Sequence, residues 1–599
     1  MIYNPLDKHF KSITGASKHG EQLRFRVKGN FGSVLFVYFK DGESAKYIEM
    51  QQKGNCFEVS LLLDIGLYFY SFLVDGNSYI SCGKKLNGQL SSSVVYYQHT
   101  VYDSNYDATS WLKGGIIYQI FPDRFNIGKD DGVCLDDRQI HTNLNDTPYF
   151  LPDENGKVQN CDFFGGNIQG IIDKLDYLKE LNVTCIYLNP IFKAYSNHRY
   201  DTGDYMTIDP LLGNLVSFKK LIDKANDYGI RVILDGVFNH TGDDSIYFNK
   251  YNNYNSIGAY NDKKSPYISW FNFMNYPDEY KSWWGITTLP ATNKAKDSGY
   301  VNFIAGEGGV IDFYTNLNIG GWRLDVVDEL PSHFVKKIRQ TAKKVNENAI
   351  IIGEVWEDAT NKISYNERRE YFWGNELDSI MNYPLKNAIL DFCLEKDFDA
   401  ISETILTEID HFPKQSLDNL MNILSTHDTF RLLSSLSGVN AKGLSKEQQE
   451  KIVLSDEQIS NAKKRLKIAS LLQFTLCGVP SIYYGDEIAM QGFADPLNRK
   501  FFSWDKIDSE ILEWYKILGK IRSGYSCFER GDYKEIYCDK GKYLFKRYDN
   551  QSALLIAVNL SDNNLDFMFS GKMFNLIDNK EFNGKISLEK FQFGVYVAI

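Results

Sequence analysis

The chain has 599 residues, which is too long for one hydrophobic core, so we expect two to four domains. Its formal net charge of −11 argues against nucleic acids and anionic membranes as partners. The sequence has no apolar run long enough to span a membrane, no secretory signal, and nine scattered cysteines without a CxxC pair. We therefore expect a cytoplasmic protein with neither a disulfide framework nor a zinc site.

Residues 1–108 predict an N-terminal β-sandwich. Short apolar strands at 23–27, 34–39 and 66–74 alternate with turns rich in Gly, Asn and Asp. The segment contains no tryptophan, the residue that often forms a platform for sugars. We expect it to serve packing or dimerisation rather than sugar binding.

From residue 109 onward, strands alternate with helical stretches, which indicates an α/β fold. Eight strands are expected, at 116–120, 184–188, 230–234, 321–325, 350–354, 377–381, 422–425 and 481–484. Apolar stripes with helical spacing lie between them, at 168–181, 215–228, 334–345 and 462–477. This pattern predicts a (β/α)8 TIM barrel formed by 109–240 and 313–524.

Two further segments complete the predicted organisation. Residues 241–312, after the third strand, form an inserted domain rich in Tyr, Asn and Trp, and insertions at this position often shape a site. Residues 525–599 return to short strands and predict a C-terminal β-sandwich.

The fourth expected strand carries two charges. Arg323 and Asp325 share one of its faces, because side chains of equal parity point the same way. Buried charges must be compensated, so this segment alone fits both a structural ion pair and a reactive pair.

Polar residues also follow other expected strands. They are Asp235 and His240 after the third, Glu354 and Trp356 after the fifth, His427 and Asp428 after the seventh, and His198 and Tyr200 after the second. In a barrel, these strand ends face one pocket. Two carboxylates across a pocket lined with aromatic rings suit glycoside hydrolysis, one as nucleophile and one as acid/base. Arg323 is placed to keep Asp325 ionised, and no metal-binding pattern competes.

Four segments carry a resemblance to a known family: 235–240, 321–329, 354–356 and 425–428. Further segments that match are 118–125, 163–167, 197–205, 381–384 and 484–487. With them the chain resembles the α-amylase family of retaining glycoside hydrolases, and within it the neopullulanase, cyclomaltodextrinase and maltogenic amylase group. The resemblance covers the barrel densely and the two β domains only by position.

The resemblance implies a role for each matched residue. Asp325 would be the nucleophile, Glu354 the general acid/base and Asp428 the third carboxylate, which binds sugar hydroxyls. The other implied substrate-binding residues are Tyr200, His198, His240, Arg323, Trp356, His427, Asp495 and Arg499. Asp235 would support Arg323, and Trp356 would lie towards the leaving group.

Two departures from the group limit what the resemblance implies. The group's Met-Pro-Lys-Leu-Asn motif is replaced by residues 289–293, of which only Pro290 and Asn293 match, so fine specificity stays open. Some relatives bind calcium beside a Gly-Gly-Asp turn, but here the turn ends in Asn167 and the loop at 126–131 is short. We expect no required cofactor, and a structural calcium is a weaker expectation.

The expected function is retaining hydrolysis of α-1,4-glucosidic bonds in maltooligosaccharides, cyclodextrins, pullulan or starch, with α-1,6 activity open. Retention predicts that the Asp325 and Glu354 carboxyl groups lie about 5–5.5 Å apart. A glucanotransferase of the same family is the alternative, and a non-catalytic glucan-binding barrel is disfavoured because all three carboxylates are present. The resemblance also implies a homodimer formed through the N-terminal domain.

Overall fold

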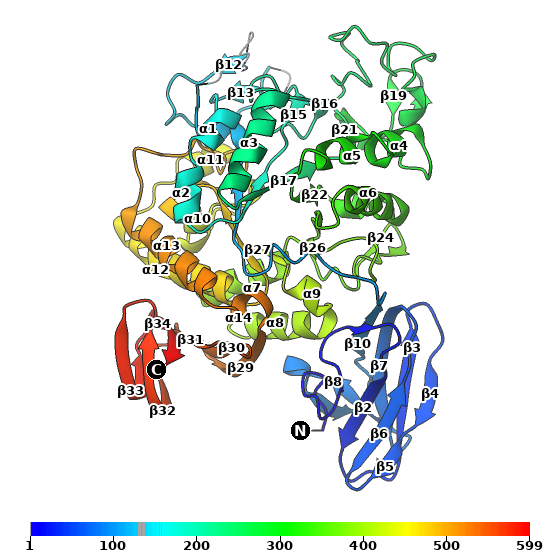
Figure 1. Cartoon of the computed structure of the whole chain (residues 1–599), viewed down its shortest axis with the longest axis vertical. Coiled ribbons are helices and arrows are strands. Elements are labelled where there is room, and N and C mark those ends of the chain that lie inside the picture. The colour runs from blue at the N-terminus through cyan, green and yellow to red at the C-terminus, as the bar shows by residue number, and fades with distance from the viewer. Residues whose placement is uncertain (1, 130–132, 134–137, 155, 157) are drawn as a thin grey trace.

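The computed structural model describes residues 2–129, 133, 138–154, 156 and 158–599. An N-terminal β domain, a large barrel and a C-terminal β domain follow one another along the chain. Both β domains lie on the same side of the barrel, at the bottom of Figure 1.

The N-terminal domain consists of two sheets packed face to face. Its strands are β1 (Ser17–Lys18), β2 (Leu23–Lys28), β3 (Val34–Lys40), β4 (Lys46–Glu49), β5 (Gln51–Lys53), β6 (Cys56–Leu61), β7 (Gly66–Val74), β8 (Ser78–Cys82), β9 (Gly88–Ser91) and β10 (Tyr97–Tyr102). Strands β2, β5 and β6 form one sheet, and the other seven form the second. Phe25 from the first sheet packs against Phe36 and Tyr70 of the second. Alternating apolar residues on both sheets thus bury a common aromatic core.

Eight parallel strands form the barrel. They are β11 (Ile117–Ile120), β14 (Cys185–Leu188), β17 (Arg231–Gly236), β22 (Gly321–Leu324), β23 (Ile350–Gly353), β26 (Ser379–Ile380), β27 (Met421–Ile423) and β28 (Val479–Tyr483). Their order around the sheet follows the chain, and a parallel bridge between Met381 and Met421 closes the ring. The predicted (β/α)8 fold is confirmed. Asp325 and Glu354 lie just beyond β22 and β23, where their side chains leave the packed barrel interior.

Helices surround the barrel strands in Figure 1. The main ones are α3 (Leu215–Asp227), α6 (Ser332–Val345), α7 (Tyr383–Cys393), α8 (Ala400–His411), α12 (Asp456–Thr475) and α13 (Ser509–Gly524). The single helix predicted at 168–181 is instead two, α1 (Ile168–Ile172) and α2 (Leu175–Glu180), because Lys174 leaves helical geometry at φ −113°, ψ 11°. Helix α12 begins earlier than its apolar stripe, where Ser455 and Gln458 form a capping box.

The segment after β17 contains two small hairpins and two short helices. They are β18 (Phe273–Asn275) with β19 (Glu279–Tyr280), β20 (Ser282–Trp283) with β21 (Ile286–Pro290), α4 (Gly299–Ala305) and α5 (Val310–Thr315). A bridge between His240 and Ala291 joins this segment to the end of the third barrel strand. The insertion therefore borders the carboxyl end of the barrel.

The C-terminal domain is antiparallel. Its strands β29 (Asp532–Asp539), β30 (Lys542–Tyr548), β31 (Ala553–Asn559), β32 (Leu565–Asn575), β33 (Lys580–Leu588) and β34 (Phe593–Ala598) join in the order β29-β30-β31-β34-β32-β33. All six join in one continuous hydrogen-bonded path, and Leu544, Leu565 and Leu588 from three of them bury a common core.

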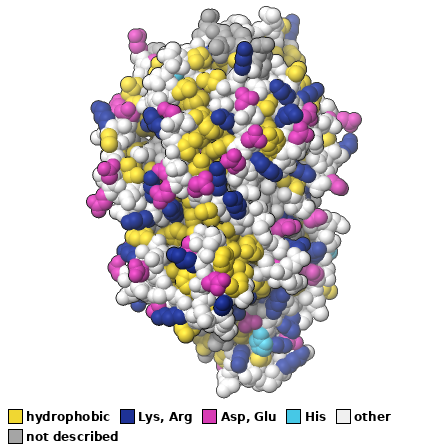
Figure 2. Space-filling view, turned by 60° about the vertical axis from the view of Figure 1, so that its left-hand side comes forward, with side chains coloured by type: hydrophobic (Ala, Val, Ile, Leu, Met, Phe, Trp, Pro, Cys, Tyr) yellow, Lys and Arg dark blue, Asp and Glu magenta, His cyan; other side chains and the backbone are white. Residues whose placement is uncertain are grey.

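The surface shown in Figure 2 carries acidic and basic side chains intermixed around a band of hydrophobic ones. Within the described ranges, no helix has the length and apolar character needed to cross a bilayer.

Candidate active site

Arg323 is the centre of the site. Its fully buried guanidinium contacts three carboxylates: Nη1 lies 2.7 Å from Asp235 Oδ1 and 3.1 Å from Asp325 Oδ1, and Nη2 lies 2.6 Å from Glu354 Oε2. These residues come from β17, β22 and β23 and the positions just after them, and these strands are neighbours in the barrel. The cation compensates a concentration of negative charge that would otherwise be very unfavourable in a buried place.

Asp325 occupies the position expected of a nucleophile. Burial raises the pKa of Asp325 well above its ordinary value, the charges of Glu354 and Asp235 raise it further, and Arg323 opposes the rise. Among the neighbouring groups, Arg323 is the one whose charge favours the ionised form of the Asp325 carboxyl group.

Val326, the residue directly after Asp325, contacts Glu354. Val326 adopts a left-handed conformation with φ +36°, which is strained for a β-branched side chain. In this conformation, its backbone N–H donates to Glu354 Oε2 at 2.9 Å. The other oxygen, Oε1, accepts from Trp356 Nε1 at 3.1 Å, and the Trp356 ring stacks on Tyr383 with 3.9 Å between centroids. Both oxygens of Glu354 are therefore fixed in direction.

A second group of residues borders the pocket from β27 and the loop after β14. The Tyr200 hydroxyl lies 2.8 Å from Asp235 Oδ2 and 2.6 Å from His427 Nε2. His427 Nε2 is also 3.1 Å from Asp428 Oδ2. Burial lowers the pKa of His427 well below its ordinary value, and Arg499 adds to the effect, so this ring is neutral and acts by hydrogen bonding.

Asp428 forms an ion pair with Arg499. Arg499 Nη2 lies 3.4 Å from Asp428 Oδ1, and Arg499 Nη1 lies 2.7 Å from Asp495 Oδ1. Weak solvation in the pocket and the charge of Glu354 raise the pKa of Asp428 to about 7, while Arg499 opposes the rise. A carboxyl group with a pKa of about 7 can accept hydrogen bonds from sugar hydroxyls when ionised and donate one when protonated.

The two remaining predicted histidines also border the pocket. His240 Nε2 lies 3.0 Å from the Tyr200 carbonyl oxygen, and its ring is 4.8 Å from that of Trp283. His198 Nδ1 accepts from the Tyr200 backbone N–H at 3.1 Å. Burial lowers the pKa of His198 and of His240 to about 3, so both rings are neutral.

The sequence analysis missed three supporting side chains. The Tyr187 hydroxyl donates to Asp235 Oδ2 at 2.6 Å, and Gln119 Nε2 lies 2.9 Å from His427 Nδ1 and donates to Asn189 Oδ1 at 3.0 Å. Gln119 and Tyr187 lie on β11 and β14, and Asn189 follows β14 directly. The sequence does indicate these residues, because side chains along a barrel strand alternate between inward and outward positions, and these polar residues occupy inward ones.

The loop considered for calcium is closed by amide hydrogen bonds. Asn167 Oδ1 accepts from the N–H groups of Gly128 and Gly170, and Asn167 Nδ2 donates to the Gly128 carbonyl at 2.8 Å. Asn126 Nδ2 also donates to a carbonyl, that of Gly170. The Asn167 amide and Asn126 Nδ2 are therefore engaged with backbone groups of the same loop. Residues 130, 131 and 132 of this region lie outside the described residues.

Comparisons with known proteins agree with this geometry. The family description "Alpha amylase, catalytic domain" matches residues 119–516. The chain is 32% identical to a cyclomaltodextrinase of Thermoanaerobacter pseudethanolicus over 86% of this chain and 82% of that one. It is 35% identical to an amylopullulanase of Thermoanaerobacter thermohydrosulfuricus over 90% of this chain and 40% of that one. It spans 33–50% of the length of the three amylopullulanases that it matches.

A solved cyclomaltodextrinase structure superposes over 99% of both chains, with a TM-score of 0.70 at 24% identity. This likeness supports the fold alone, whereas the family match spans most of the barrel and includes the strand ends that bear Arg323, Asp325, Glu354 and Asp428. The chain therefore belongs to the α-amylase family of glycoside hydrolases, and its relatives in that family include cyclomaltodextrinases and a neopullulanase.

Proposed function

We propose that this protein hydrolyses α-1,4-glucosidic bonds in maltooligosaccharides, cyclodextrins, pullulan or starch with retention of anomeric configuration. The observation that carries the proposal is the contact of one guanidinium, Arg323, with both Asp325 and Glu354. Two carboxylates that contact the same cation lie near each other, which supports a double-displacement reaction.

The proposed reaction has two steps. Asp325 attacks the anomeric carbon while the protonated Glu354 gives its proton to the departing glycosidic oxygen, which leaves a glycosyl ester on Asp325. Glu354 then removes a proton from water, the water oxygen bonds to the same carbon, and the ester bond breaks. His240, His427, Asp428 and the Tyr200 ring would hold the reacting sugar, with Arg499 and Asp495 behind them.

Substituting the nucleophile tests the assignment. Asp325→Asn should lower kcat by at least about a thousandfold, because the ester can no longer form. Binding of maltotriose, measured by calorimetry, should persist. Asp223→Asn, on the exposed side of α3, is the matched control. Wild-type turnover in Asp325→Asn would refute the proposal, and NMR of the first-formed anomer would test retention.

A glucanotransferase remains the second candidate, because a specific observation supports it. Trp356, which donates to Glu354, and Trp284, which donates to Glu329, are 48% and 67% exposed. Open aromatic faces suit a sugar acceptor that competes with water. The ratio of transfer to hydrolysis products from maltotriose decides between the two, and rates on starch, pullulan and β-cyclodextrin would establish the preferred glucan and any α-1,6 cleavage.

We also propose a homodimer formed through the N-terminal domain, on the basis of the resemblance. Sedimentation of the full chain and of a chain that starts at residue 109 would test it. A monomeric full chain at micromolar concentration would rule it out.

A further inference from the structure

A small hairpin follows the loop that carries Glu354 and Trp356. Its strands β24 (Ile363–Ser364) and β25 (Glu367–Arg368) are antiparallel, with Ile363 opposite Arg368. Two contacts join the hairpin to the turn at residues 327–329, which follows Asp325. Ser364 Oγ donates to the Asp328 carbonyl at 3.1 Å, and Lys362 Nζ lies 3.2 Å from Asp328 Oδ2. Movement of the hairpin would therefore move the turn at 327–329.

The same hairpin forms part of an aromatic wall. Glu329 Oε1 accepts from the Tyr365 hydroxyl at the hairpin tip and, at 3.0 Å, from Trp284 Nε1 of the insertion. Trp284 stacks on Trp283, with 4.1 Å between ring centroids. We call Trp284, Glu329, Trp356 and Tyr365 the exit wall. Its three rings are 48–67% exposed, and one of them, Trp356, donates to Glu354, whereas His427 is 1% exposed.

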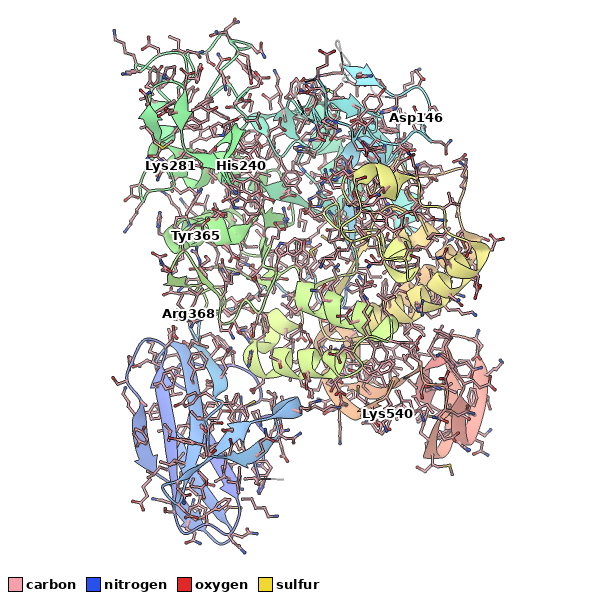
Figure 3. All side chains as sticks on the ribbon, turned by 180° about the vertical axis from the view of Figure 1, so that it is seen from behind. Asp146, His240, Lys281, Tyr365, Arg368 and Lys540 are labelled. Carbon is pink, nitrogen blue, oxygen red and sulfur yellow. The ribbon has the colours of Figure 1, made fainter. Side chains whose placement is uncertain are left out.

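The N-terminal domain holds the hairpin by an ion pair. Asp41, in the turn after β3, accepts from Arg368 Nε at 2.7 Å and from Nη2 at 3.0 Å, a two-point contact. Figure 3 shows Arg368 at the boundary with the N-terminal domain, with Tyr365 and then His240 farther along the same side. The pair is mostly buried, with side-chain exposures of 18% and 28%, so solvent screens it less than an exposed pair.

A second contact holds the base of the hairpin. Gln98 of β10 is buried and donates through Nε2 to Thr360 Oγ1 at 2.8 Å. Its Oε1 accepts from Asn361 Nδ2, also at 2.8 Å. The N-terminal domain therefore contacts this segment at two places in the same chain.

We propose that Asp41 and Gln98 are positioning residues for the leaving-group side of the site, acting through Arg368 and the hairpin on the exit wall. This inference rests on the proposed function, because the wall binds the departing or accepting sugar only if Glu354 is the acid/base. The N-terminal domain then influences the choice between water and sugar as acceptor within one chain, whether or not a second copy is present.

The test uses full-length Asp41→Asn, Arg368→Gln and the double variant. Each single variant should change the ratio of transfer to hydrolysis products from maltotriose by about threefold, the size expected from losing a partly buried ion pair. The double variant should change it no further than either single one, because both remove the same contact. Glu43→Gln is the matched control, since Glu43 lies in the same turn but pairs with Lys46 of its own domain at 3.1 Å.

Three outcomes would overturn the inference. One is an Asp41→Asn product ratio equal to that of Glu43→Gln. Another is additive effects in the double variant. The last is a uniform loss of rate with a lower Tm and an unchanged ratio, which would mean a merely structural contact. A wild-type protein that cleaves no α-glucan would instead refute the proposed function, so the two failures are distinguishable.

Discussion

At the scale of single residues, the site depends on a few polar groups that serve several partners. Asp235 accepts from Arg323, Tyr187 and Tyr200 and is 1% exposed, so it is a support rather than a reacting group. Arg323 in turn forms ion pairs with Asp325 and Glu354. Hydrogen-bonded networks of this kind hold a site in one geometry before substrate arrives.

The Tyr200 hydroxyl links the two sides of this network. Tyr200→Phe removes its contacts with Asp235 and His427 while keeping the ring that would stack on the sugar. We expect kcat/KM on maltotriose to fall by about tenfold, because a hydrogen bond to a charged group contributes roughly 1.5–3 kcal/mol. Tyr195→Phe, half-exposed on the same loop, should leave kcat/KM unchanged. Equal values for the two variants would contradict the role assigned to the hydroxyl.

At the scale of elements, helices and loops carry features that the reaction does not use. On α8, Glu408 is buried, and its Oε2 has no hydrogen-bond partner among the described residues. Burial raises the pKa of Glu408 to about 8. Between these two pKa values, the folded state therefore keeps the proton on Glu408, whereas the unfolded chain, with an ordinary pKa of about 4.3, releases it. The contribution of Glu408 to the free energy of unfolding is fully present below about pH 4.3 and is lost as the pH rises through about 8.

Replacing Glu408 with glutamine should remove this pH dependence. Glu408→Gln keeps the shape and cannot ionise, so its Tm should exceed that of the wild type by about 2–4 °C at pH 9 and match it near pH 5. Scanning calorimetry across this range gives the comparison. Glu403→Gln, on the same helix but partly exposed, is the control. A Tm for Glu408→Gln that stays below that of the wild type at pH 9 would show that the ionised carboxylate is needed.

The loop closed by Asn167 leads to a prediction about metals. Because its amide groups bond to backbone partners, treatment with a chelator should shift the Tm by less than about 1 °C, as expected when no ion binds the folded state preferentially. Asn167→Ala should lower the Tm with or without chelator, since the cap of α1 is lost. A chelator-dependent drop in the wild type would point to a bound cation.

At the scale of the whole molecule, two buried arginines meet at the end of α12, and one of them, Arg547, joins the C-terminal domain to the barrel. Arg547 of β30 donates to the carbonyls of Thr475 and Cys527 at 3.0 and 2.9 Å. Arg522 of α13 donates to those of Phe474 and Gly478 at 2.7 and 2.6 Å. The last carbonyls of a helix lack partners within it, so these guanidinium groups cap the end of α12.

Removing one of these caps should loosen the junction. Arg547→Met leaves buried carbonyls without donors, and we expect the Tm to fall by about 5 °C. Arg530→Met is the control, because that side chain is 56% exposed. If both variants melt together with the wild type, the arginine contacts do not hold the domains together.

The sequence by itself determined the barrel, the number of its strands and the residues at their ends. Period-2 strands, period-3.6 helices and turn residues are local signals, and a barrel turns strand ends into one pocket. The same signals wrongly predicted one helix across Lys174, because the apolar stripe continues there although the backbone leaves helical geometry. They also could not give the order of the strands in the C-terminal domain, since strand pairing joins residues far apart in sequence.

Only the tertiary structure decided which charges meet. Arg323 and Asp325 are two residues apart in the sequence, but the contact of Arg323 with Glu354 depends on neighbouring strands, and Tyr200 reaches His427 across the pocket. The contact between Asp41 and Arg368 joins residues 327 positions apart. Such contacts arise from packing between elements, for which the sequence carries no local pattern.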